Sequence, residues 1–106
     1  MYTMYFDGAS RSNPGPASFG GVIYNSDNEE IINFKKYIGK NTNNVAEYMG
    51  CLAGIRLALE NDITSLNVFG DSMLVVNQLN DKWKVKSDNL KPIYKEIKKY
   101  TPRFTF

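Results

Sequence analysis

The sequence contains no histidine, and its only cysteine is Cys51. Without histidine, the chain cannot form a Ser–His–Asp or Cys–His catalytic group, and zinc sites built from histidine and cysteine are excluded. A single cysteine cannot form an internal disulfide, so the chain is not a disulfide-stapled secreted scaffold. Any bound metal must therefore have oxygen ligands, which favours hard cations such as Mg²⁺ or Mn²⁺.

Long apolar runs are also missing. No stretch approaches the roughly 18 consecutive apolar residues of a membrane-spanning helix. The N-terminus has no basic segment followed by an apolar one, so it does not resemble a signal peptide. We therefore expect no membrane partner and, by default, an intracellular, cytoplasmic location. The 106 residues suffice for one domain, and a hydrophobic fraction of 42% suffices for its core.

Charge is distributed unevenly along the chain. The net charge is only +2, but the segment from Lys82 to Arg103 contains eight basic and two acidic residues. The first 81 residues are therefore acidic overall. A basic end indicates a polyanionic partner or, alternatively, a solvated lysine-rich helix face, and charge alone leaves both interpretations open.

Alternating apolar residues, turn residues and helix caps predict five strands and three helices. The predicted strands are Tyr2–Phe6, Phe19–Tyr24, Glu30–Ile38, Ser65–Phe69 and Arg103–Phe106. The predicted helices are Val45–Glu60, with Thr42 or Asn43 as its cap, Ser72–Asn80 and Asp88–Tyr100. Short connections make the first three strands an antiparallel meander, and a right-handed helical crossover would place the fourth strand parallel to the first. The order predicts an α/β domain with a mixed sheet covered by helices.

Three acidic residues are predicted to converge at one end of this sheet. Asp7 follows the first strand and Asp71 the fourth, and ligand sites in open α/β sheets lie at the carboxyl ends of parallel strands. Two carboxylates on adjacent strands repel each other, and with no basic neighbour a divalent cation is the natural counter-charge. Glu47, in the first turn of its helix, shares a small-residue stripe with Gly50 and Gly54 and would provide a third ligand.

Each acid also has a structural interpretation. Asp71 could cap the following helix, Asp7 could form a turn with Gly8, and Glu47 could interact favourably with the helix dipole. The hypothesis of a metal site therefore depends on all three converging. Cys51 lies among helix residues that face the sheet, and we expect it to belong to the core.

Several short motifs occur along the chain in a characteristic order. They are Asp7-Gly8-Ala9-Ser10, Asn13-Pro14-Gly15-Pro16, Gly20-Gly21, Thr42-Asn43-Asn44-Val45-Ala46-Glu47, Gly70-Asp71-Ser72 and the segment 83–92. Together they resemble the type 1 ribonuclease H family, in the compact form that lacks the basic protrusion. The resemblance implies a ribonuclease H-like mixed five-stranded sheet and a metal-dependent endonuclease that hydrolyses the RNA strand of RNA–DNA hybrids.

The resemblance also implies roles for individual residues. Asp7, Glu47 and Asp71 match catalytic carboxylates that bind Mg²⁺ or Mn²⁺, two ions in the complete family site. Three asparagines match positions that contact RNA 2′-hydroxyls, namely Asn13, Asn43 and Asn44. Four residues match a binding site for a DNA phosphate, namely Lys40, Thr42, Ser87 and Asn89. The alternatives are turn or cap roles for Asn13 and Asn43 and, for Trp83, a packing role instead of a contact with DNA.

The chain departs from the family pattern at its C-terminal end. The family carries a fourth active-site aspartate on a helix after the fifth strand, whereas this sequence stops at Phe106. The resemblance therefore predicts a single domain, 1–106, that is incomplete at its C-terminus, without the final helix and with reduced activity. A catalytically inactive hybrid-binding module is the alternative, as is another nuclease or transferase on the same fold. The oligomeric state is left open.

Overall fold

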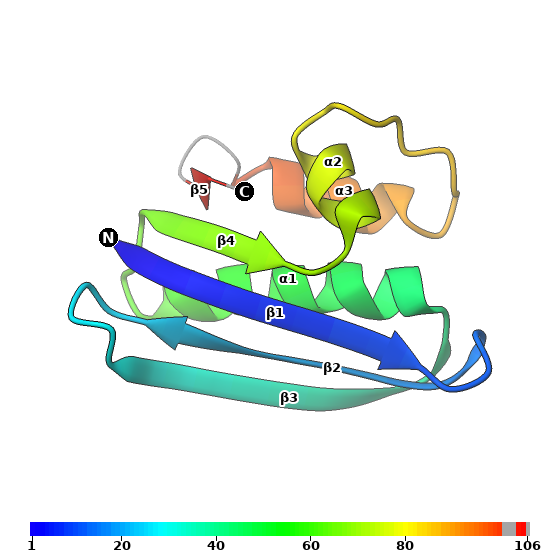
Figure 1. Cartoon of the computed structure of the whole chain (residues 1–106). Coiled ribbons are helices and arrows are strands. Elements are labelled where there is room, and N and C mark those ends of the chain that lie inside the picture. Colours follow the sequence, from blue (N-terminus) through cyan, green and yellow to red (C-terminus); the bar gives the residue numbers. More distant parts are fainter. Residues whose placement is uncertain (101–103, 106) are drawn as a thin grey trace.

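The computed structural model describes residues 1–100, 104 and 105. Five strands form one mixed sheet in the order β3-β2-β1-β4-β5 (Figure 1). The strands are β1 (Tyr2–Ser10), β2 (Gly15–Tyr24), β3 (Glu30–Asn41), β4 (Leu66–Gly70) and β5 (Phe104–Thr105). The helices are α1 (Asn43–Glu60), α2 (Met73–Leu79) and α3 (Lys91–Lys98). The predicted α/β architecture is confirmed.

Strand pairing follows the predicted topology. β1 pairs with β2, and β2 with β3, in antiparallel fashion, whereas β4 runs parallel to β1. The parallel register places Phe6 beside Gly70. The residues that follow them, Asp7 and Asp71, are therefore brought to the same end of the sheet.

Helix α1 lies along one face of the sheet and packs against it through small residues (Figure 1). A Cβ atom added to Gly54 would overlap the sulfur of Met4, and one added to Gly50 would lie 3.3 Å from the backbone oxygen of Asp7. Cys51 is fully buried, as predicted for a core residue. The predicted small-residue stripe thus allows α1 to approach β1 closely.

Helices α2 and α3 lie together on the β4 side of the molecule (Figure 1). An ion pair between Arg56 of α1 and Glu96 of α3, at 3.3 Å, links α3 to the central helix. On the sheet face opposite α1, the rings of Tyr5 and Phe69 are half exposed and stack at 5.4 Å between centroids. Within the described residues, no helix has the length and apolar character needed to cross a membrane.

The first three strands are longer than predicted. Much of the predicted loop 9–17 continues the β1–β2 hairpin, because Ser10 pairs with Ala17 and the Arg11 N–H donates a hydrogen bond to the Pro16 carbonyl at 2.9 Å. Asp7 therefore lies within β1 and does not close it, contrary to the prediction. Backbone pairing extends the hairpin although the side chains of this part are polar or small. A prediction based on alternating apolar residues therefore misses these strand residues.

Helix α1 begins two residues earlier than predicted. The Thr42 hydroxyl accepts a hydrogen bond from the Val45 N–H at 3.2 Å, which confirms Thr42 as the N-cap and makes Asn43 the first helical residue. Glu47 therefore lies at the start of the second turn, whereas the prediction placed it in the first. The dipole interpretation of Glu47 is weakened accordingly, because dipole effects fade beyond the first turn.

Helix α3 begins later than predicted, at Lys91 instead of Asp88. Pro92 explains the difference, because proline is tolerated in the first turn of a helix but clashes with the preceding turn when it lies deeper. Helix α2 and strand β4 agree with prediction to within one residue at each end. The two middle residues of the predicted strand 103–106 form β5. Its two ends, Arg103 and Phe106, lie outside the described residues.

Candidate active site

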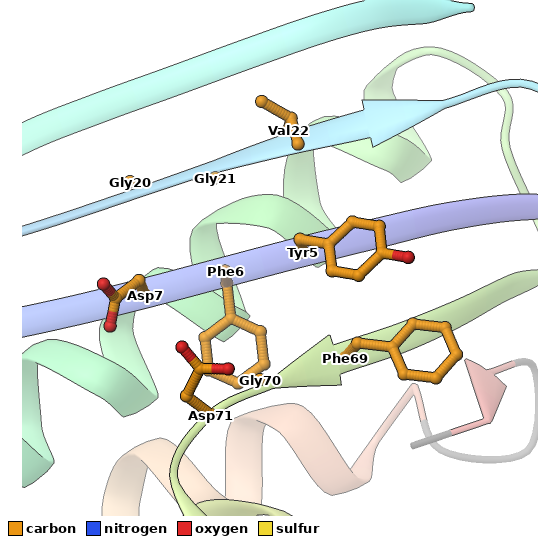
Figure 2. A pocket seen from close by; sticks show the side chains of 9 residues that line it. All are labelled: Tyr5, Phe6, Asp7, Gly20, Gly21, Val22, Phe69, Gly70 and Asp71. Atoms are coloured by element: carbon orange, nitrogen blue, oxygen red, sulfur yellow. The ribbon is translucent and has the colours of Figure 1, made fainter. Parts of the chain in front are cut away.

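A hollow of about 550 Å³ opens over the ends of β1 and β4, on the sheet face opposite α1. Asp7 and Asp71 lie at one end of this hollow, and the aromatic rings of Tyr5 and Phe69 lie at the other (Figure 2). Asp7 is exposed, and its Oδ1 accepts a hydrogen bond from the Gly8 N–H at 2.9 Å. The two carboxylates on neighbouring parallel strands therefore line the same hollow.

Glu47 reaches the same end of the sheet from α1 and is buried, with an exposed fraction of 8%. The pKa of Glu47 is raised from an ordinary value of 4.5 to about 7, and burial is the largest cause. Its hydrogen bond to Asp7 and the negative charges of Asp7 and Asp71 also contribute to the rise, while the Gly8 backbone N–H acts in the opposite direction. Near neutral pH, Glu47 is thus close to the midpoint of its titration.

Gly8 allows α1 to come this close to β1. A Cβ atom added to Gly8 would lie 2.5 Å from the backbone nitrogen of Glu47 and 2.6 Å from the Ala46 oxygen. Both contacts are with backbone atoms, which cannot move aside without shifting the helix. The Asp-Gly pair therefore places a carboxylate on β1 directly beside the one on α1.

One carboxylate oxygen at this site has no partner. Glu47 Oε2 is buried and accepts no hydrogen bond within the described part of the chain. A buried, unsatisfied acceptor is costly, and a bound cation would satisfy it. As arranged here, the described residues contain no group of three or more acidic, cysteine or histidine side chains that could hold a metal. The donor chemistry fits a hard cation, whereas closure of Asp7, Glu47 and Asp71 around one ion stays a prediction.

The predicted asparagines tie the β1–β2 turn to the start of α1. Asn13 Oδ1 accepts a hydrogen bond from the Asn43 N–H at 2.9 Å, and Asn43 Oδ1 accepts one from the Ser10 N–H at 2.6 Å. These contacts support the structural alternative for both residues. Because the bonds use the side-chain oxygens, the amide NH₂ groups remain the atoms that could face a ligand.

A second groove, of about 380 Å³, lies between α1, α2 and the segment before α3. We call it the phosphate groove, and its polar lining includes Asn44, Lys84, Lys86 and Ser87. The structure thus brings Asn44 and Ser87 together. Asn89 accepts a hydrogen bond from Ser87 but does not line the groove.

Like Asn89, two further predicted phosphate-binding residues do not line this groove. The hydroxyl of Thr42 caps α1, and Lys40 is exposed on β3, opposite Pro16. Of the four predicted phosphate-binding residues, only Ser87 therefore lines the groove. The roles of Lys40 and Thr42 stay predictions.

Comparison with known proteins identifies the family of the chain. A family described as "Reverse transcriptase-like" matches residues 5–106. Ribonuclease HI of Halobacterium salinarum is 39% identical over 87 residues, which cover 82% of this chain and 44% of the relative. The solved N-terminal RNase H domain of Rv2228c from Mycobacterium tuberculosis, a fusion with maltose binding protein, has a TM-score of 0.92 at 39% identity, covering 97% of this chain and 75% of that chain.

The chain belongs to the ribonuclease H family. The compost-derived LC11-RNase H1, solved in complex with an RNA/DNA hybrid, is 32% identical with a TM-score of 0.92 and covers all of this chain. The chain spans about a quarter to a half of the length of the curated relatives it matches. Foamy-virus protease–reverse transcriptase, at 19% identity and a TM-score of 0.76, shares only the fold.

A buried relay in this ribonuclease H domain was not predicted from the sequence. The Tyr48 hydroxyl donates a hydrogen bond to Gln78 Oε1 at 2.6 Å, and Gln78 Nε2 donates one to the Lys84 carbonyl at 3.2 Å. The relay connects the residue after Glu47 to the segment that carries the phosphate groove. Its only signal in the sequence is a glutamine at an otherwise apolar position of α2, which pattern analysis treats as an exception.

Proposed function

We propose that this chain carries the site of a metal-dependent endonuclease that hydrolyses the RNA strand of RNA–DNA hybrids. The observation that supports the proposal most is the buried Glu47 oxygen beside Asp7 of β1, which has no hydrogen-bond partner among the described residues. A purely structural glutamate would gain nothing from this position, because burial and a neighbouring carboxylate both oppose its charge. A divalent cation would reverse that balance.

Asp7, Glu47 and Asp71 would hold the cation, Mg²⁺ or Mn²⁺, with two ions in the complete family site. When bound, such ions activate water and stabilise the leaving oxygen at a phosphate. The protein provides three negative charges at the shared end of two parallel strands. It also sets the protonation state of Glu47, which must lose its proton before that carboxylate can act as a full ligand.

Selection of the RNA strand would come from the asparagines. The side-chain oxygens of Asn13 and Asn43 each accept a hydrogen bond from a backbone N–H group. Their amide NH₂ groups are therefore positioned before any ligand arrives. Asn44 is exposed in the phosphate groove. Contacts to 2′-hydroxyl groups distinguish RNA from DNA, and fixed donors make such contacts at low entropic cost.

The complementary DNA strand would be held through one of its phosphates near Ser87. The phosphate groove presents Lys84 and Lys86 beside Ser87, which suits a phosphate oxygen. Lys40, Thr42 and Asn89 belong to the proposed set through the family resemblance. Holding both strands would place the RNA phosphate at the carboxylates.

A cleavage assay with three matched substrates tests the proposal. An RNA–DNA hybrid, an RNA duplex and a DNA duplex of one sequence are each incubated with the protein in Mg²⁺ or in EDTA. We expect cleavage only of the RNA strand of the hybrid, and only in Mg²⁺ and not in EDTA. The products should carry 3′-hydroxyl and 5′-phosphate ends, as the resemblance implies. Asp7→Asn should abolish it, whereas Asp27→Asn, in the exposed turn before β3, should not. Equal cleavage of all three duplexes would refute the proposal.

The second candidate is a hybrid-binding module without catalysis. It is favoured by the structural roles of Asn13 and Asn43, which fix the binding surface independently of any metal. Under this alternative, the hybrid binds more tightly than either pure duplex, but its RNA strand stays intact in Mg²⁺. Binding and cleavage measured on the same hybrid separate the two functions.

A further inference from the structure

Trp83, the only tryptophan of the chain, stands between two grooves. One is the phosphate groove. The other, which we call the lysine groove, has a volume of about 510 Å³ and is lined by Lys82, Trp83, Lys84, Lys91, Tyr94 and Lys95, with Asp81 at its edge. Trp83 and Lys84 line both grooves. A strand bound in the phosphate groove can therefore continue past the indole into the lysine groove.

The lysine groove has a strong excess of positive charge. Its one acidic group, Asp81, is already neutralised by Lys98 at 2.8 Å and also accepts a hydrogen bond from the Tyr94 hydroxyl at 2.6 Å. Of the four lysines, only Lys91 has an ion-pair partner among the described residues, the highly exposed Asp88 at 3.1 Å. The other three lysines are exposed and have no ion-pair partner in the part of the chain that the structure describes, which favours a polyanionic ligand.

The indole determines which polyanion fits. Trp83 is 47% exposed, although burying a tryptophan is favourable. An exposed aromatic ring beside lysines is the arrangement with which proteins bind unpaired bases, because the base stacks on the ring while the lysines contact phosphates. Bases in a duplex are already stacked on one another and offer no free face.

The segment that carries Trp83 is fixed in place. The N–H groups of Lys82 and Trp83 both donate hydrogen bonds to the Asn77 carbonyl, at 2.8 and 3.1 Å. The Lys84 carbonyl accepts the hydrogen bond from Gln78, which is itself buried. A ring held on an ordered backbone loses little entropy when a base stacks on it.

We propose that the lysine groove is a binding site for single-stranded nucleic acid, with one base stacked on Trp83 and the neighbouring phosphates held by Lys82, Lys91 and Lys95. The inference rests on the proposed function for the class of ligand, since it extends the path of a bound strand beyond the duplex. It assigns to the protein an affinity for unpaired overhangs that the cleavage site does not require.

Intrinsic fluorescence tests the proposal directly, because Trp83 is the only tryptophan. The protein is titrated with a 12-nucleotide oligo-dT in EDTA, where cleavage cannot contribute. We expect saturable quenching of Trp83 that weakens as salt rises. Binding without a change in Trp83 fluorescence would overturn the proposal, as would equally tight binding of poly-glutamate, which would identify the groove as a site for acidic peptides.

Two lysine variants, each lacking two charges, locate the site. Lys82→Gln with Lys95→Gln removes two groove lysines, whereas Lys35→Gln with Lys36→Gln removes two exposed lysines of β3. Measured by polarisation of labelled oligo-dT, the first pair should weaken binding about tenfold and reduce the salt slope by about 1.4, at about 0.7 per phosphate contact. Equal losses in the two double variants would show that only overall charge matters and would overturn the proposal.

The tryptophan itself is tested by two substitutions. Trp83→Ala should weaken oligo-dT binding about 5- to 150-fold, which corresponds to the roughly 1–3 kcal/mol attributed to one stacked base. Trp83→Phe, which keeps an aromatic ring, should lose less, and circular dichroism verifies that both variants fold. Unchanged affinity in folded Trp83→Ala would contradict the stacking role. Because no hybrid and no Mg²⁺ are used, this outcome is independent of whether the protein cleaves hybrids.

Discussion

The carboxyl group of Glu47 opposes folding whenever it is ionised and no cation is bound. Its pKa is about 7 in the folded protein and near 4.5 in the unfolded chain, so the folded state holds the proton more tightly. Such a group favours the folded state fully below about pH 4.5, and this contribution declines as pH rises to about 7.

Glu47→Gln should therefore stabilise the protein in EDTA at neutral to alkaline pH. We expect a gain of at most about 3 kcal/mol in the free energy of unfolding near pH 8, shrinking toward pH 5, because glutamine never ionises. Urea unfolding at several pH values measures it. Glu60→Gln, at the exposed end of α1, is the control and should show no such trend. A constant difference across pH would contradict the account of Glu47.

At the residue scale, the sequence predicted the acids better than the asparagines. Asp7 and Asp71 were identifiable because each comes at or near the end of an apolar strand, and the parallel register then aligns them. The tether between Asn13 and Asn43 joins residues 30 positions apart, and no local pattern encodes it.

At the level of elements, the contact between β1 and α1 positions the site. Gly8→Ala should destabilise the protein by about 2–4 kcal/mol, because the new methyl group would meet the backbone of Ala46 and Glu47. Thermal unfolding measures the loss. Gly20→Ala is the matched control on β2, where an added Cβ would meet nothing closer than 3.1 Å. Equal effects at Gly8 and Gly20 would contradict the close approach.

The relay through Gln78 links α1, α2 and the segment of Trp83. Tyr48→Phe should cost about 1–3 kcal/mol, because it leaves the buried Oε1 of Gln78 without its donor. It should also loosen the segment that follows α2, seen as faster hydrogen exchange there and a shift in Trp83 emission. Tyr37→Phe, on an exposed side chain of β3, should do neither. Unchanged exchange in Tyr48→Phe would remove the relay as a positioning device.

The elements themselves were predictable to different degrees. Helix α1 and strand β4 were found because caps and apolar runs bound them, whereas the far end of the β1–β2 hairpin was missed because its polar and small residues indicate a loop. The predicted start of α3 at Asp88 is too early, because Pro92 would then be the fifth residue of the helix and not part of its first turn. Strand pairing determines where the β1–β2 hairpin ends, and proline geometry determines where α3 begins; composition determines neither.

For the whole molecule, the uneven charge predicts how hybrids bind. The basic segment after residue 81 should make affinity fall steeply with salt, because phosphate contacts release counterions. Titration of the hybrid and of the DNA duplex at several salt concentrations measures both slope and preference. We expect a similar slope for each but tighter binding of the hybrid. Equal affinities would remove the role assigned to Asn13, Asn43 and Asn44.

We expect residues 1–106 alone to cleave hybrids weakly. The family resemblance implies a fourth carboxylate in addition to Asp7, Glu47 and Asp71, and loss of even a group that only supports a metal ligand commonly costs 10–100-fold. Joining the domain to a C-terminal segment that supplies the fourth acid should raise the cleavage rate. The rates of the two forms in Mg²⁺ provide the comparison, and full activity of residues 1–106 would show that this acid is dispensable here.

The central claim is that Asp7 in β1, Asp71 after β4 and Glu47 on α1 form a cation site. Isothermal calorimetry with Mg²⁺ and Mn²⁺, near pH 8 where Glu47 is mostly ionised, tests it most directly. The account predicts binding that Asp7→Asn and Glu47→Gln each weaken at least about tenfold and that Asp27→Asn leaves unchanged. Binding of equal strength in all four proteins, or in none of them, would contradict it.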